Sequence, residues 1–118
     1  MTDPIQRQIS RALGGIRSAF RAVLTLVESG AGVQLAQADG LAGEQVQSAE
    51  LFQHYGLTSN PPAGSMAVVL PLGGKTSHGI VIATEHGGYR LQGLASGEVA
   101  LYSDEGDSVV LRRGRVVE

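Results

Sequence analysis

Glycine-containing turns divide most of this chain into short segments. All but two of its 17 glycines lie after residue 29, and valine and leucine are frequent in the segments between them, whereas aromatic residues make up only 4% of the chain. Short apolar segments separated by tight turns are typical of antiparallel barrels and sandwiches. We therefore predict a mostly β protein, and the 118 residues suit one domain better than two.

The individual segments carry different strand signals. Residues 33–38 alternate apolar and polar side chains, as half-buried strands do. Residues 65–70 and 79–84 are continuous apolar runs, which favour buried strands. The predicted strands are 22–28, 33–38, 44–53, 65–70, 79–84, 98–102, 108–112 and 115–117, with a shorter segment at 89–91. Their spacing fits an OB-like barrel at residues 22–105, followed by a C-terminal hairpin at residues 106–118.

The first 21 residues differ from the rest in charge and periodicity. Residues 1–22 carry four arginines and one aspartate (+3), whereas residues 23–118 carry five basic and ten acidic residues (−5), and together these give the net charge of −2. At helical spacing the arginines lie opposite an apolar face. We predict an amphipathic helix at residues 1–21. It could cover the protein's own sheet, dock on a partner or lie on a membrane surface.

Residues that often carry chemistry do not form a recognisable site. Residues 73–76 resemble the end of a phosphate-binding loop, but the glycine that this motif requires five residues before Gly74 is absent. The histidines are not spaced as metal ligands usually are. A possible serine, histidine and aspartate trio has no nucleophile elbow. Cysteine is absent, which excludes disulfides and thiolate ligands. We expect no enzyme activity, no catalytic residue and no cofactor from the residues considered, which are 73–76, His54, His78, His86, Ser77 and Asp104.

Four motifs follow one another after Phe52. They are residues 55–59 (YGLTS), 77–83 (SHGIVIA), 89–94 (YRLQGL) and 97–106 (GEVALYSDEG). In order and spacing they resemble the baseplate spike proteins of Mu-type contractile-tailed phages, also called the baseplate assembly protein V family. The resemblance includes the arginine-rich head, so it extends over nearly the whole chain.

The resemblance implies a structural virion protein in the tail baseplate, assembled in the host cytoplasm. Family members are homotrimers whose N-terminal region and OB-type domain contact the hub and tail tube. Their C-terminal β-helix forms a needle that breaches the outer membrane, with an apex iron bound by a His-x-His motif. This sequence has no such motif and stops at Glu118, before the needle. We therefore expect a hub role for this segment, with no apex iron and no direct membrane contact. Two alternatives stay open for the tip: it belongs to a longer form of this chain, or a separate tip protein is a further partner.

The resemblance also suggests which residues meet partners. The expected hub-facing residues are Ile5, Arg7, Ile9, Arg11, Leu13, Ile16, Arg17, Phe20 and Arg21. The expected trimer interface consists of Val99, Leu101, Val109, Leu111 and Val116, because the last strands would otherwise have unpaired edges. An OB-type module that binds a small ligand or an oligonucleotide is the alternative. The acidic body and scarce aromatic residues disfavour nucleic acid.

Overall fold

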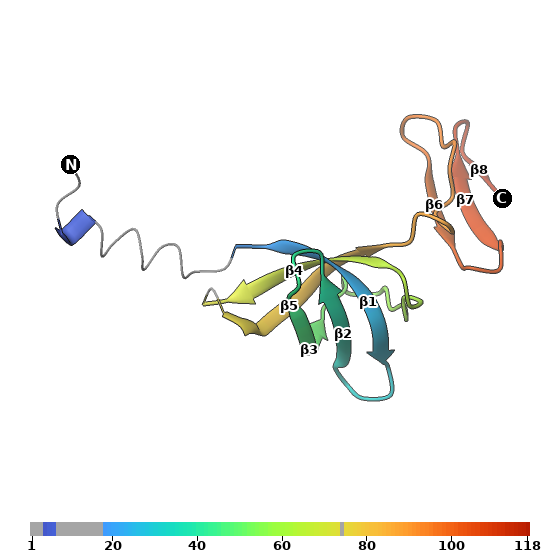
Figure 1. Cartoon of the computed structure of the whole chain (residues 1–118). Helices are drawn as coiled ribbons and strands as arrows, with labels where there is room; N and C mark the ends of the chain where they lie inside the picture. The colour runs from blue at the N-terminus through green and yellow to red at the C-terminus, as the bar shows by residue number, and fades with distance from the viewer. Residues whose placement is uncertain (1–3, 7–17, 74) are drawn as a thin grey trace. The chain divides into compact units, whose positions relative to one another are not determined.

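The computed structural model describes residues 4–6, 18–73 and 75–118. By its internal contacts the chain separates into two units, Met1–Glu85 and His86–Glu118. Each unit contains its own β-sheet, and Figure 1 shows them from blue and green to yellow and from orange to red. The prediction of a mostly β protein is confirmed.

Five strands of the first unit form a closed barrel. They are β1 (Phe20–Glu28), β2 (Gln34–Gly40), β3 (Gln45–Leu51), β4 (Met66–Leu72) and β5 (Lys75–Glu85). The order around the barrel is β1-β2-β3-β5-β4, and β1 also pairs with β4 (Figure 1). Only the β3–β5 pair is parallel. Closure pairs the edges of the sheet, so the barrel strands are not left as open templates for aggregation.

Small side chains fill the barrel. Inward positions alternate along the strands, as in Phe20, Ala22 and Leu24 on β1, and all three are buried. Five of the core residues are alanines, which suits the narrow interior of a five-stranded barrel. The core consists of Phe20, Ala22, Leu24, Ala36, Ala38, Val46, Ala49, Leu51, Ala67, Val69 and Val81.

An irregularity in β3 keeps its apolar residues facing inward. The β2–β3 register shifts between Ala36 and Ala38, and Ser48 has a positive φ of 53°. The Ser48 backbone N–H donates to Oε1 of Gln37 at 3.1 Å, and the Gln37 amide donates to the Ser48 hydroxyl at 3.3 Å. This β-bulge places two residues between buried Val46 and Ala49, so both side chains point into the core.

The connection from β3 to β4 is held in place by side chains. The Gln53 amide oxygen accepts a hydrogen bond from the Ser59 N–H at 2.8 Å. The Gln34 amide donates to the Ser59 carbonyl at 3.0 Å. At the end of β3, the Phe52 N–H donates to the Val81 carbonyl on β5 at 3.1 Å. These bonds fix the chain as it leaves the barrel, and they fix the position of Phe52.

The second unit contains a three-stranded antiparallel sheet. Its strands are β6 (Val99–Tyr102), β7 (Ser108–Arg112) and β8 (Val116–Val117), in the order β6-β7-β8 (Figure 1). The β6–β7 turn includes Gly106 and the β7–β8 turn includes Gly114, whose φ angles are 92° and 81°. Glycine favours such turns because a positive φ costs it nothing sterically.

The structure differs from the expected elements at residues 20–21 and at residues 87–90. Helix is described only at Pro4–Gln6, and residues 7–17 of the predicted helix lie outside the described residues. Phe20 and Arg21 belong to β1, because Phe20 pairs with Val69 and continues the two-residue alternation of the strand. Residues 87–90 form a turn and bend instead of the predicted short strand. The second of the two contact-based units begins at His86, and its strand β6 pairs with β7.

Candidate interaction surface

One face of the β6–β8 sheet consists of large apolar side chains. Directly paired residues of antiparallel strands lie on the same face. Val99 pairs with Leu111, Leu101 pairs with Val109, and Leu111 also pairs with Val117. These five side chains are 48–68% exposed. Single exposed apolar residues are common, but a contiguous group marks a candidate interaction site. We call these five residues the apolar sheet face.

The opposite face of this sheet is mixed. It includes buried Val110 and half-buried Arg112, and Val116 pairs with Arg112. Val116 therefore lies on the other side of the sheet from Val117. Four of the five residues expected at a trimer interface thus share the apolar sheet face, whereas Val116 does not and Val117 takes its place. The four are Val99, Leu101, Val109 and Leu111.

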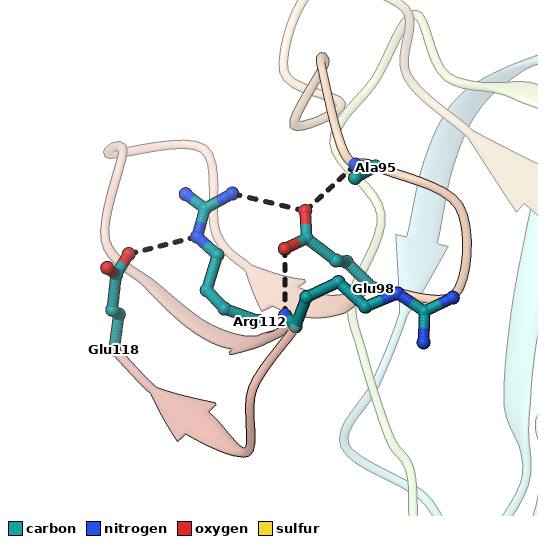
Figure 2. A network of polar contacts seen from close by, with 5 residues as sticks. Ala95, Glu98, Arg112 and Glu118 are labelled. Atoms are coloured by element: carbon teal, nitrogen blue, oxygen red, sulfur yellow. Dashed lines mark hydrogen bonds and ion pairs between the residues drawn. The ribbon is translucent and has the colours of Figure 1, made fainter.

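The Glu98 carboxylate joins the turn before β6 to the β7–β8 hairpin (Figure 2). It accepts hydrogen bonds from the backbone N–H of Ala95 at 2.8 Å and of Arg113 at 3.0 Å. Arg112 Nη1 lies 3.4 Å from the same carboxylate, whose side chain is only 7% exposed. These donors, the Ala95 N–H foremost, favour the charged form and lower the pKa of Glu98. The carboxylate therefore holds two turns together in its charged state.

Arg112 also connects to Glu118, the residue that follows β8. Its Nε donates to Glu118 Oε2 at 3.0 Å, and this bond raises the pKa of the arginine. The backbones of Val110 and Glu118 exchange two hydrogen bonds of 2.9 Å each. Gly97 has a φ of 88°, and a side chain there would collide with the Arg113 guanidinium. The Arg112 side chain thus links Glu98 to Glu118, and the Arg113 guanidinium lies beside Gly97.

The residues considered for catalysis or metal binding are divided between the two units of the chain. His54 and His78 are exposed, and His78 lies within β5. Asp104 lies in the turn between β6 and β7 of the second unit. In the described part of the chain, no group of three or more histidine, cysteine, aspartate or glutamate side chains could hold a metal ion. Within that part, no helix is long and apolar enough to cross a membrane.

Some of the expected hub-facing residues are exposed, one is buried, and the others lie outside the described part of the chain. Ile5 is 68% exposed in the helical turn Pro4–Gln6. Phe20 is buried in the barrel core, and Arg21 is exposed on β1. The remaining residues lie outside the described part of the chain: Arg7, Ile9, Arg11, Leu13, Ile16 and Arg17.

The sequence of the barrel matches that of a known protein family. The family described as "Bacteriophage Mu Gp45, N-terminal" matches residues 21–88, which include nearly all of the barrel. The chain belongs to the Mu gp45 family. It is 30% identical over 118 residues to the "Baseplate puncturing device gp45" of Escherichia phage Mu, covering 99% of this chain and 57% of that protein.

A second gp45 relative comes from a bacterial genome. The "Mu-like prophage FluMu protein gp45" of Haemophilus influenzae (strain ATCC 51907 / DSM 11121 / KW20 / Rd) is 35% identical over 91 residues, covering 77% of this chain and 50% of that protein. The chain thus spans about half the length of these two gp45 proteins. Its predicted resemblance to the Mu-type baseplate spike proteins is confirmed.

Two features of the second unit could not be predicted from the sequence. Val117 was not expected on the apolar sheet face, because its position depends on the register set by the turn at Gly114 and by Arg115, whose φ is also positive at 63°. The Glu98 contacts were missed because their partners lie up to 15 residues away. The sequence does indicate a turn just before β6, because Gly97 and Glu98 precede its alternating residues.

Proposed function

We propose that this chain is a non-enzymatic structural component of a phage tail baseplate, acting as a homotrimer that connects the hub to the membrane-puncturing tip. The name of its phage Mu relative, a baseplate puncturing device, supports the baseplate role. The strand order, with one parallel pair closing a five-stranded barrel, supports an OB-type fold for the first unit. In this proposal the chain belongs to the virion tail, and its partners are the hub, the tail tube, a tip protein and further copies of itself.

The apolar sheet face carries the trimer proposal. Five neighbouring apolar side chains, each about half exposed or more, lose contact with water when identical chains pack together. Cyclic association is the usual way for identical chains to cover such a face. The short β8 also leaves a strand edge that association would protect. We assign the trimer contact to Val99, Leu101, Val109, Leu111 and Val117.

Leu101→Ser tests this contact directly. Loss of a central apolar side chain should weaken trimer formation by roughly tenfold or more. Tyr102→Ser is the matched control, because Tyr102 neighbours Leu101 on β6, is 43% exposed and lies on the opposite face. Sedimentation equilibrium would measure both variants against the parent chain. Equal effects of the two substitutions would contradict the assigned face.

The charges of the barrel argue against the oligonucleotide-binding alternative. Residues 18–85 carry two basic side chains, Arg21 and Lys75, and five acidic ones: Glu28, Asp39, Glu44, Glu50 and Glu85. Proteins that bind nucleic acid without reading its sequence depend on positive charge along the phosphate backbone. We therefore do not adopt this alternative.

A further inference from the structure

The outer surface of the barrel is polar on one strand and apolar on another. On β3, the outward residues Gln45, Gln47 and Glu50 are polar and exposed. On β4, the buried residues Ala67, Val69 and Pro71 alternate with further apolar residues that face outward. Strands that are apolar on both faces usually lie between two layers of protein. The outward side of β4 thus has the composition of a covered surface. Its residues are Met66, Val68, Leu70 and Leu72.

The neighbouring strand extends this apolar surface. Leu70 pairs with Ile80 on β5. The β4–β5 register then shifts between Val68 and Val69, which leaves Ile82 as an extra residue, 50% exposed. On the far side of β5, Leu51 pairs with Val81 and both are buried. The next residues, Phe52 and Ile82, therefore face outward beside each other.

We call this surface the barrel wall, and we define it by Phe52, Val68, Leu70, Leu72, Ile80 and Ile82. Four of its residues are large and 42–52% exposed: Phe52, Leu70, Leu72 and Ile82. Its composition is unusual for a surface exposed to water, since Lys75 is the only Asp, Glu, Lys or Arg between residues 51 and 84. A contiguous patch of this kind marks a protein interface.

Charges of opposite sign border the barrel wall on its two sides. Arg21 on β1 pairs with Val68, so its exposed side chain flanks the β4 side. Glu50 on β3 pairs with Ile80, so its exposed side chain flanks the β5 side. In a ring of identical subunits, one side of each subunit meets the other side of the next. Each junction would then bring an arginine of one copy to a glutamate of its neighbour.

We propose that a second copy of this chain covers the barrel wall, with Arg21 of one copy beside Glu50 of the next. The inference rests on the homotrimer proposed above and adds a contact between barrels to the contact between the apolar sheet faces. The apolar residues supply most of the driving force, and the charged residues at the borders set the orientation.

Charge reversal tests the orientation. Arg21→Glu and Glu50→Arg should each weaken trimer formation, by about tenfold at low salt, because each brings like charges together at all junctions. The double variant Arg21→Glu/Glu50→Arg restores opposite charges and should recover most of the loss. Asp39→Arg is the matched control, since it makes the same charge change as Glu50→Arg at an exposed position of β2. Sedimentation equilibrium measures the constants.

Substitution of the wall itself tests the apolar contact. Leu70→Ser/Ile82→Ser should weaken trimer formation by more than tenfold, while circular dichroism shows the barrel still folded, because both side chains face outward.

If Leu101→Ser weakens the trimer and the wall and charge variants do not, the barrel contact is wrong while the proposed homotrimer stands. If the wall and charge variants act and Leu101→Ser does not, the barrel contact stands and the sheet contact fails. A parent chain that stays monomeric at every concentration overturns both.

Discussion

At the scale of single residues, the second unit depends on a few polar contacts. Its three strands are short, and Val110 is the only buried hydrophobic side chain among residues 86–118. The unit therefore has little apolar core of its own, and backbone donors held by the Glu98 carboxylate matter more for its order than they would in a larger domain. Gly97 could be predicted as a turn residue from the sequence, but the partners of Glu98 on the β7–β8 hairpin could not, because they follow from the pairing of β6 with β7.

Glu98 makes the stability of the second unit depend on pH. Its pKa in the folded protein lies below the ordinary value of 4.5, so its stabilising contribution is present above that value and is lost as the pH falls through the lowered pKa. Glu98→Gln should therefore destabilise the unit at neutral pH and reduce its sensitivity to acid. Hydrogen exchange of the Arg113 amide, from neutral pH to below 4.5, measures both effects.

Glu105→Gln is the control for this experiment. It removes the same charge from the exposed β6–β7 turn. The account of Glu98 is contradicted if both variants leave the same protection of the Arg113 amide and the same dependence on pH.

At the scale of elements, strand periodicity in the sequence was informative where one face of the strand is buried. The apolar run 65–70 lies almost wholly within β4, and the irregular segment 44–53 contains β3 with its bulge at Ser48. The start of β1 was harder to place. Phe20 fits the helical spacing from Ile16 and also the strand spacing to Ala22, and only its pairing with Val69 decides between them.

This placement of β1 defines a deletion that separates attachment from folding. Removal of residues 1–17 leaves every strand of the barrel intact, whereas a deletion through residue 21 would remove Phe20 from its core. We predict that the shorter deletion leaves thermal unfolding of the barrel nearly unchanged and reduces incorporation into baseplates at least about tenfold, because the proposed hub contact involves this segment.

Incorporation would be measured by quantifying the chain in purified particles after complementation. Replacement of Arg7, Arg11 and Arg17 by glutamine, in the full-length chain, is the companion variant, and it keeps the apolar residues of the segment. Normal incorporation of the deleted chain would show that the hub contact lies elsewhere.

At the scale of the whole molecule, the sequence predicted the family, the β architecture and four residues of the apolar sheet face, but neither Val117 on that face nor the barrel wall. The resemblance to the Mu-type baseplate proteins could be predicted because it depends on motifs that are local in the sequence. The apolar sheet face and the barrel wall follow from register, since a shift of one residue would turn each apolar side chain to the other face of its strand. Val116 and Val117 illustrate this limit, because the sequence favours both equally and the pairing of β8 separates them.

The central claim is that three copies of this chain associate through these surfaces. Sedimentation equilibrium of the unmodified chain over a wide concentration range tests it most directly. The account predicts that a species of three times 12.2 kDa becomes dominant as concentration rises. A mass of 12.2 kDa at every concentration, or association that stops at a dimer, would contradict it.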